Sequence, residues 1–552
     1  MTPAENIGFV IGGSLKEGLF VRLTVPAERI QEGAFVVIES NGLKFYGLVV
    51  NLSLKSYDPR YSQDLIAGRM SDKITTLLHN QTLFTEMEVL PVLMQNTGPE
   101  LEDPNYDPNA VMDKSPMPVK TLPIHQAPVR LATEFDISEV FKPKEKNGFV
   151  IGTTREQGHP VHIDMDKFIQ RSSGIFGATG TGKSYLTRMI LAGLIQSKQA
   201  AVLVFDMHNE YAYGDISPDT DIKAPGLCEK MKKRVKSCAL GASAKIAGNQ
   251  PDFDLVLEYS DILPSDIEML TRELNLRETT PATLSALVQS FGINKWFESF
   301  KNLTMGEGEG SVVDWARNNN VNEAAALSLY SKLERVFRLN YLVPKLTGPS
   351  SIVKIIDYLK NGYSVILSFG EYETDLDYLL VTNILTRKIR EEWERMTNEY
   401  RNQGGVKPTP LVIALEEAHK LLNREMAGQT TFSTIAREMR KYFVTLLIID
   451  QRPSQIYDEV MSQLGTRISG WLGDDEDIAA VLSGLSGRDS LRGMLARLQP
   501  KEEVLLLGYG VPMPIPIRSR RYDAQFWQEM LNEDELSATD KQKFREMIFD
   551  DF

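Results

Sequence analysis

Eight residues in the first third of the chain have the types and spacing that bind phosphate groups. Gly177-Ala-Thr-Gly-Thr-Gly-Lys-Ser184 fits the pattern G-x-x-x-x-G-K-[ST]. Glycines let successive backbone N–H groups turn toward a phosphate, and a helix N-terminus adds partial positive charge. In such a loop the lysine neutralises the β- and γ-phosphates, and the last hydroxyl binds Mg²⁺. The pattern predicts binding of ATP and Mg²⁺ through Gly177, Thr179, Gly180, Thr181, Gly182, Lys183, Ser184 and Tyr185, with Ser184 as a metal ligand.

An accidental match in a glycine-rich turn is the alternative interpretation. With glycine at about 7% of residues, such a match arises in roughly one chain in fifty of this length. The flanking segments favour the functional interpretation, because Ser173–Phe176 is typical of a short strand and Tyr185–Ile195 of a helix. A strand, the loop and a helix in this order are the context that the motif requires.

Nucleotide hydrolysis also needs a carboxylate near the metal and a group that orients water. Two strand-like apolar runs end in acids: Ala200–Phe205 is followed by Asp206, and Leu411–Leu415 by Glu416 and Glu417. Parallel sheets bind ligands at the carboxyl ends of their strands. We therefore expect Glu416 to face Mg²⁺ through its water shell and Glu417 to polarise the attacking water, with Asp206 also near the nucleotide. The alternative is a solvated helix start, a position that favours acids.

A further strand-like run, Val444–Ile449, is followed by Asp450-Gln-Arg. Gln451 at this place is suited to sense the γ-phosphate. In oligomeric ATPases an arginine from a neighbouring subunit often stabilises the charge of the transition state. Each arginine by itself is more typical of a surface cation, but we expect one of this group to act: Arg437, Arg440 and Arg452.

Composition limits the class of protein. The 552 residues have room for three or four domains, and 42% hydrophobic with 24% charged residues is typical of a globular protein. No stretch approaches the ~18 apolar residues of a membrane helix. The N-terminus lacks a basic region followed by an apolar one, and two cysteines exclude a disulfide framework or a four-cysteine metal site. We expect a cytoplasmic protein with no membrane attachment.

The net charge of −13 bears on nucleic-acid binding. A protein that coats nucleic acid with its whole surface is expected to be basic, so the charge argues against that class. It leaves open nucleic acid held in a local channel. The basic cluster Lys230–Lys236 is more typical of a solvated helix face than of a DNA contact.

Residues 1–130 are predicted to form an N-terminal β-barrel and a proline-rich linker. Short β-branched or aromatic runs such as Gly18–Val25 and Leu43–Val50 are separated by turn residues such as Asn41-Gly42. Small domains of this kind close into barrels, which removes exposed edges. A structural or oligomerising barrel is favoured over one that binds nucleic acid, because no basic-aromatic alternation marks a binding face.

The rest of the chain alternates strand-like and helical segments, which predicts an α/β fold with a parallel sheet and right-handed crossovers. A helical pattern with a capping box, Ser265 with Glu268, interrupts it. Glu503–Tyr509 is predicted as the last strand. The predicted division is 131–215 and 346–520 for the two parts of the nucleotide-binding core, 216–345 for a helical insertion, and 521–552 for a peripheral helical tail.

With these motifs in order, the chain resembles the HerA family of the HerA–FtsK branch of RecA-like motor ATPases. The resemblance spans roughly residues 1–520 and rests on an ordered set, which is more specific than the phosphate-binding loop alone. The set consists of the barrel, Arg171 with the loop, Asp206-Met-His-Asn-Glu-Tyr211, the helical insertion, Glu416-Glu-Ala-His419 and Asp450-Gln-Arg-Pro453.

The resemblance implies a homohexameric ring with a RecA-like core that uses ATP to translocate double-stranded DNA through its central pore. It makes Glu417 the catalytic carboxylate and Gln451 the sensor. Arg171 matches an arginine proposed to reach the neighbouring subunit's nucleotide, and Arg440 matches a second cation. Relatives act with a NurA-type nuclease in DNA end resection, or with a sirtuin-like NADase or a nuclease in antiphage defence, and the barrel would dock such a partner.

Three hypotheses follow for the activity. The first is a ring-forming, ATP-driven DNA motor. The second is a scaffold whose ATP binding controls oligomerisation and activates a bound nuclease or NADase with little translocation, which the acidic charge mildly favours. The third is a motor that moves protein, and the lack of a membrane anchor counts against it.

Overall fold

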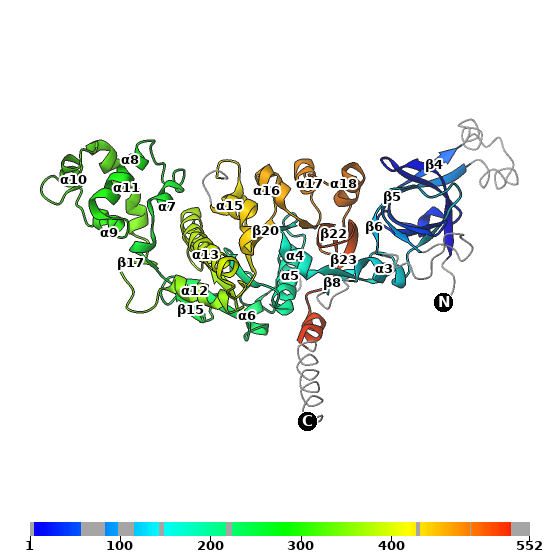
Figure 1. Cartoon of the computed structure of the whole chain (residues 1–552), viewed down its shortest axis with the longest axis horizontal. Coiled ribbons are helices and arrows are strands. Elements are labelled where there is room, and N and C mark those ends of the chain that lie inside the picture. Colours follow the sequence, from blue (N-terminus) through cyan, green and yellow to red (C-terminus); the bar gives the residue numbers. More distant parts are fainter. Residues whose placement is uncertain are drawn as a thin grey trace, which may run out of the picture. The chain divides into compact units, whose positions relative to one another are not determined.

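The computed structural model describes most of the chain in two compact units, which are considered separately below (Figure 1). The first unit consists of residues 1–164, 176–183 and 465–520, and the second of residues 165–175, 184–464 and 521–552. Within these units the described residues are 5–56, 83–97, 115–142, 148–216, 223–426, 431–485 and 487–531.

The N-terminal strands of the first unit close into a barrel, as the sequence predicts (blue in Figure 1). The strand order is β2-β1-β7-β3-β4-β5, and β5 pairs back with β2. Asn41 and Gly42, with φ of 46° and 74°, connect β3 to β4 in the two-residue turn that such dipeptides favour. Alternate residues such as Val36 and Val89 fill the interior. The bounds are β1 (Asn6–Ser14), β2 (Gly18–Leu23), β3 (Phe35–Ser40), β4 (Leu43–Ser56), β5 (Leu83–Asn96), β6 (Met117–Pro118, beside β5) and β7 (Pro128–Leu131).

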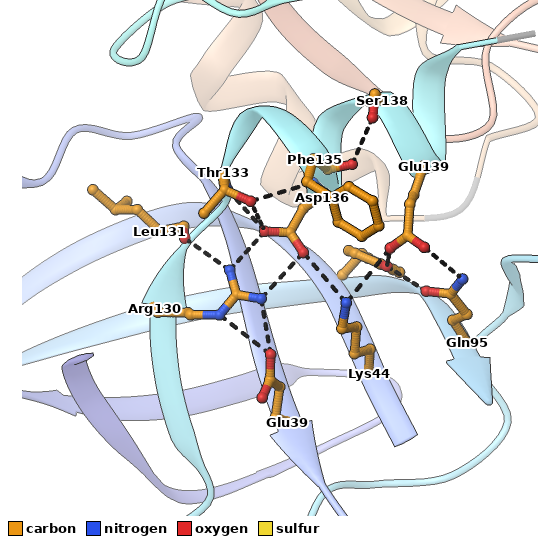
Figure 2. Close-up of polar contacts among 11 residues, drawn as sticks. Glu39, Lys44, Gln95, Arg130, Leu131, Thr133, Phe135, Asp136, Ser138 and Glu139 are labelled. Carbon is orange, nitrogen blue, oxygen red and sulfur yellow. Dashed lines mark hydrogen bonds and ion pairs between the residues drawn. The ribbon is translucent and has the colours of Figure 1, made fainter. Parts of the chain in front are cut away.

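A buried polar network fastens helix α3 (Glu134–Phe141) to the barrel (Figure 2). Arg130 of β7 donates from Nη1 to Asp136 Oδ2 at 2.6 Å and from Nη2 to Asp136 Oδ1 at 3.1 Å. Lys44 Nζ of β4 lies 3.6 Å from Asp136 Oδ1 and 3.5 Å from Glu139 Oε2. Thr133 caps the helix in a capping box with Asp136, so the same carboxylate ends the strand-to-helix turn and holds the ion pair.

The remaining strands of the first unit form an antiparallel array in the order β21-β22-β23-β8-β9. Glu503 of β22 accepts two hydrogen bonds of 2.7 Å from Arg155, whose Nη1 also donates to the Glu32 carbonyl of the barrel at 3.1 Å. The prediction that Glu503–Tyr509 is the last strand is wrong, because β23 follows it. The bounds are β8 (Gly148–Thr154), β9 (Pro160–Asp164), β21 (Thr466–Ser469), β22 (Glu503–Gly508), β23 (Ile515–Ser519), α17 (Asp475–Val481) and α18 (Arg488–Ala496).

The second unit is built on a largely parallel sheet in the order β15-β14-β18-β11-β19-β20-β10. Its central strands are continuous apolar runs that are buried along their whole length, which is typical of parallel strands covered on both faces. The bounds are β10 (Ser173–Phe176), β11 (Ala201–Asp206), β14 (Val235–Leu240), β15 (Phe253–Leu255), β18 (Ser364–Ser368), β19 (Leu411–Glu416) and β20 (Val444–Asp450).

The longest helix of this unit begins and ends at capping residues. This helix, α13 (Asp375–Gln403), starts after Thr374, whose side chain accepts from the Asp377 amide, and stops at Gly404 with φ of 66°. The other helices and short pairs are α4 (Met165–Gln170), α5 (Lys183–Ser197), α12 (Ser351–Lys360), α14 (His419–Leu422), α15 (Thr431–Glu438), α16 (Asp458–Gln463), β12 (Asp215–Ile216), β13 (Lys223–Ala224), β16 (Leu257–Glu258) and β17 (Leu342–Val343).

The helical insertion is present as the group α7–α11 (green in Figure 1), which packs around Trp296 and Phe300. The predicted capping box of Ser265 is wrong: Asp266 binds the Leu263 amide at 2.8 Å instead. The bounds are α7 (Pro264–Glu268), α8 (Thr280–Phe291), α9 (Trp296–Lys301), α10 (Val312–Asn318) and α11 (Glu323–Phe337).

The beginning of the predicted helical insertion differs from the expectation. After the short helix α6 (Leu227–Lys230), β14 and β15 add strands to the core sheet. The basic cluster Lys230–Lys236 therefore does not form a helix face; it ends on β14. A short buried run, Val235–Leu240, follows the lysines, and its burial against β18 determines the local structure. The domain boundaries themselves stay predictions.

In the described part of the chain, no helix combines the length and the apolar character that crossing a bilayer would require. Residues 524–531 form the start of the predicted helical tail, and the remainder of that tail lies outside the described residues.

Candidate nucleotide site

The phosphate-binding loop joins the end of β10 to the first turn of α5, as the motif requires. Within the first unit the Ala178 amide donates to the Trp471 carbonyl at 3.1 Å, and the Lys501 amide to the Thr181 carbonyl at 3.2 Å. Gly180 and Gly182 have φ of 76° and 86°, a region that side-chain-bearing residues rarely adopt. The backbone hydrogen bonds with Trp471 and Lys501, together with the two glycine conformations, thus fix the shape of the loop.

The donor set of this loop fits a nucleotide phosphate with Mg²⁺. Lys183, only 9% exposed, is the first residue of a 15-residue helix, and Ser184 follows it. An ammonium, a hydroxyl and a helix N-terminus together provide positive potential and an oxygen ligand. The roles of the individual loop residues stay predictions.

Three neighbouring strands of the second unit end in buried acids at one edge of the sheet. β11 ends at Asp206, β19 at Glu416 and β20 at Asp450, and each of these residues is at most 2% exposed. Because the strands are parallel and adjacent, their carboxyl ends meet there. This is the edge at which the sequence places the acids.

The Asp206 carboxylate is occupied by the turn that follows its own strand. Oδ1 accepts from the Glu210 amide at 2.8 Å and Oδ2 from the Tyr211 amide at 3.0 Å. Burial raises the pKa of Asp206 to about 6, although these amide hydrogen bonds oppose the increase. The two amide hydrogen bonds show that Asp206 shapes the turn that follows β11. Direct contact between Asp206 and a nucleotide stays a prediction.

Glu416 is held from two sides. Tyr211 donates its hydroxyl to Oε1 at 3.3 Å, and the His208 amide donates to Oε2 at 3.4 Å. The Tyr378 hydroxyl of α13 donates to the Glu416 carbonyl at 2.7 Å. Burial is the main cause that raises the pKa of both tyrosines, so they remain neutral donors.

Glu417 occupies a strained backbone position, with φ of 48°, immediately after β19. Left-handed residues other than glycine are uncommon and cluster at functional sites. Gln451, directly after β20, donates from Nε2 to Glu417 Oε1 at 2.9 Å. The Glu417 side chain is 12% exposed, so it is oriented by an amide and still accessible to solvent. The predicted water-polarising residue and the predicted sensor therefore touch.

A histidine–aspartate pair supports Glu417. His419 Nδ1 lies 3.0 Å from Asp450 Oδ2 and 3.6 Å from Glu417 Oε2, and the His419 amide donates to Asp450 Oδ2 at 2.8 Å. The hydrogen bond to Asp450 raises the pKa of His419. Burial alone would raise the pKa of Asp450, but His419 and the Arg452 amide outweigh it and lower that pKa.

The candidate arginines lie on the surface. Arg437 and Arg440 line a shallow depression with Lys441, and Arg437 Nη1 is 3.4 Å from Glu459 Oε2. Arg171 and Arg452 are also exposed. Exposure is compatible with reaching another subunit, and which arginine acts stays a prediction.

The structure adds supporting residues that sequence reasoning missed. Tyr378 and Arg188, whose Nε donates to the Glu210 carbonyl at 2.7 Å, had no sequence signal, because each meets the site through tertiary contacts. His419 and Asp450 stood inside quoted motifs without an assigned role, although a histidine two residues after Glu417 was a signal.

The family model described as "Helicase HerA, central domain" matches residues 149–389. The chain is also 24% identical over 524 residues to the DNA double-strand break repair helicase HerA of Sulfolobus acidocaldarius, with 94% of both chains covered. Over most of its length the chain is thus similar to proteins of the HerA family. A probable helicase of Methanocaldococcus jannaschii is 25% identical over 98% of this chain and 95% of its own length.

Among solved structures, the bacterial conjugative coupling protein TrwBΔN70 in its trigonal form matches part of this chain. It has 12% sequence identity and a TM-score of 0.46 over 70% of this chain and 92% of its own. VirB4 of Thermoanaerobacter pseudethanolicus has 15% identity and a TM-score of 0.44 over 69% and 98% of the two chains.

Proposed function

We propose that this chain is a ring-forming, ATP-dependent double-stranded DNA translocase or helicase of HerA type. The observation that carries the proposal is the contact between Glu417 and Gln451 at the ends of β19 and β20, in a chain whose β10 leads through a phosphate-binding loop into α5. Similarity over 94% of the chain to a protein named a DNA double-strand break repair helicase supports DNA as the substrate.

Each of the predicted site residues would have a separate role in ATP hydrolysis. Lys183 and the loop amides would bind the phosphates, and Ser184 with Glu416 would hold Mg²⁺, which neutralises charge on the phosphates. Glu417, 12% exposed and bound to Gln451, would orient and polarise the attacking water. The His419–Asp450 pair, of which Asp450 is fully buried, would help to keep Glu417 in place. An arginine from a neighbouring subunit, Arg171, Arg437, Arg440 or Arg452, would complete the site in a homohexamer.

The partners belong to the same proposal. Double-stranded DNA would pass through the pore of the ring, and a NurA-type nuclease or a sirtuin-like or nuclease defence effector would dock on the barrel. A scaffold that binds ATP and activates such an effector with little translocation is the second candidate, because the net charge of −13 is unusual for a DNA-coating surface.

The test is ATP hydrolysis by the purified chain with and without linear duplex DNA, together with its mass in solution. We expect a hexamer whose hydrolysis is stimulated by DNA, and a loss of about 100-fold or more in Glu417→Gln. Glu323→Gln is the matched control, because its carboxylate is 43% exposed on α11, a helix of the insertion. DNA-independent hydrolysis, or hydrolysis that appears only after a partner protein is added, would favour the scaffold.

A further inference from the structure

One short turn supplies hydrogen-bond donors to both carboxylate oxygens of Glu416. The turn follows β11 and spans residues 207–211. Tyr211 donates its hydroxyl to Oε1 at 3.3 Å, and the His208 amide donates to Oε2 at 3.4 Å. Because Tyr211 is fully buried and Glu416 is 2% exposed, water does not compete for these contacts. The position of this turn therefore determines where the Glu416 carboxylate points.

The turn is held rigidly at its base and at its tip. Asp206 accepts from two amides of the turn, as described above. At the tip, Asn209 has φ of 58°, and it exchanges hydrogen bonds with Gly370: the Gly370 amide donates to Asn209 Oδ1 at 3.2 Å, and Asn209 Nδ2 donates to the Gly370 carbonyl at 3.4 Å. A left-handed residue stays in place only when its surroundings fix it. The turn is thus a preformed support.

Arg188 connects this support to the helix that follows the phosphate-binding loop. Arg188 lies on α5 one helical turn after Ser184, so the two residues share a helix face. It is 3% exposed, and its Nε donates to the Glu210 carbonyl at 2.7 Å while Nη2 donates to the same oxygen. A buried guanidinium is costly, and an apolar side chain of similar volume is often at least as stabilising. The same guanidinium lies 5.7 Å from the centroid of the Tyr185 ring, in the first turn of α5. Arg188 therefore joins the turn to α5, which indicates a positioning role.

We propose that Arg188 and Tyr211 are positioning residues that tie the helix carrying Ser184 to the carboxylate of Glu416. The hydrogen bond from Arg188 to the Glu210 carbonyl fixes the turn to α5. The hydrogen bond from the Tyr211 hydroxyl then fixes the Glu416 carboxylate relative to the turn. Ser184 and Glu416, the two side chains of the second unit that are expected to hold Mg²⁺, then keep a constant orientation relative to each other. This inference rests on the proposed function, because it concerns the residues expected to hold Mg²⁺ during ATP hydrolysis.

The test compares Arg188→Lys and Tyr211→Phe with two matched controls. Arg234→Lys alters an arginine that binds the other end of α5, through the Gln196 carbonyl at 3.2 Å and Gln196 Oε1 at 2.7 Å. Tyr341→Phe removes another fully buried hydroxyl, which donates to Asp377 Oδ1 at 2.7 Å and not to Glu416. Tyr341→Phe measures what the loss of an equally buried hydroxyl contact does to folding, and Arg234→Lys measures the loss of a partly buried arginine contact to the same helix.

We expect kcat for ATP to fall about 3- to 10-fold in Tyr211→Phe and at least tenfold in Arg188→Lys, because one or two hydrogen bonds are lost. KM for ATP should change less than twofold, and the Mg²⁺ concentration for half-maximal rate should rise several-fold. Binding of a fluorescent ATP analogue without Mg²⁺ and the melting temperature should match the controls. The double variant should lose less than the product of the single losses, because both residues act through one turn.

The measurements distinguish failure of the proposed function from failure of the positioning role. If the wild type does not hydrolyse ATP, the proposed function fails and this inference fails with it. If the wild type is active and both variants equal the controls in kcat and Mg²⁺ dependence, only the positioning role is refuted. The positioning role is equally refuted if activity falls only in proportion to the folded fraction, since a purely structural residue would behave in that way.

Discussion

Replacing Asp136 by Asn should loosen the attachment of α3 to the barrel, because the substitution removes the charge and keeps the shape of the side chain. The Asp136 side chain is 1% exposed and accepts hydrogen bonds from Arg130 at 2.6 and 3.1 Å and from the Thr133 amide at 2.8 Å (Figure 2). Burial alone would raise its pKa, but these contacts outweigh burial and lower the pKa to about 2, from its ordinary value of 3.8. A pKa that falls from 3.8 to about 2 corresponds to about 2.5 kcal/mol of stabilisation of the charged form.

The assay is amide hydrogen exchange of β7 and α3 in the full chain, which reports the free energy of local opening. We expect exchange to become roughly 70-fold faster in Asp136→Asn, the equivalent of about 2.5 kcal/mol. Glu39→Gln is the matched control, because Glu39 binds the same Arg130 at 2.8 Å but is 51% exposed. An exposed ion pair contributes less than about 1 kcal/mol, so this control should change exchange less than fivefold. Equal effects of the two variants would refute the reasoning.

The Asp136 carboxylate also makes the free energy of local opening depend on pH, and the sign of this dependence follows from its lowered pKa. The pKa of Asp136 is lower in the folded state than in the unfolded state, so its stabilisation is fully present above the unfolded value near 3.8. It is lost as the pH falls from there through about 2. The difference in opening free energy between wild type and Asp136→Asn should therefore be constant from neutral pH down to pH 5 and should narrow below pH 4. A difference that narrows near neutral pH would contradict this assignment.

Three further predictions concern the second unit. Gln451→Leu removes the donor to Glu417 and should lower kcat about tenfold with unchanged nucleotide binding, whereas the exposed Gln463→Leu should not. The hydrogen bond to Asp450 raises the pKa of His419, so its stabilisation is present below its unfolded pKa near 6.5 and is lost as the pH rises through the folded value. The difference in melting temperature between wild type and His419→Gln should therefore shrink as the pH rises above about 6.5, and a constant difference would contradict the pairing. Trp393→Ala empties a fully buried site and should cost about 3–5 kcal/mol, visible as a lower melting temperature.

The sequence was informative where structure depends on local pattern. Continuous apolar runs such as Leu411–Leu415 became central parallel strands, and Asn41-Gly42 formed the predicted tight turn. Local pattern failed at Val235–Leu240, where lysines before a short apolar run suggested a helix. That run is a strand because it pairs with β18 on one side and with β15 on the other, and such pairing partners are not visible in the segment itself.

The supports of the candidate site were less accessible to sequence reasoning, for a physical reason. Tyr211 and Tyr378 lie far from Glu416 in the sequence and meet it only because β11 and α13 pack beside β19. A buried tyrosine is most often part of the core, so its type gives no signal until the partner of its hydroxyl is seen. The left-handed backbone of Glu417 is likewise a property of the assembled sheet edge.

The two adjacent acids differ in a way that bears on their roles. Glu416 is 2% exposed, and both of its oxygens already accept hydrogen bonds, so it is held still in a place that free water does not reach. The backbone turns left-handed at the next residue, which ends β19 and sends the Glu417 side chain toward β20, where Gln451 orients it at 12% exposure. A group that polarises water needs access to water, and a group that holds a metal shell needs a fixed position. This difference supports Glu417 as the residue that activates water and Glu416 as the residue directed at the metal.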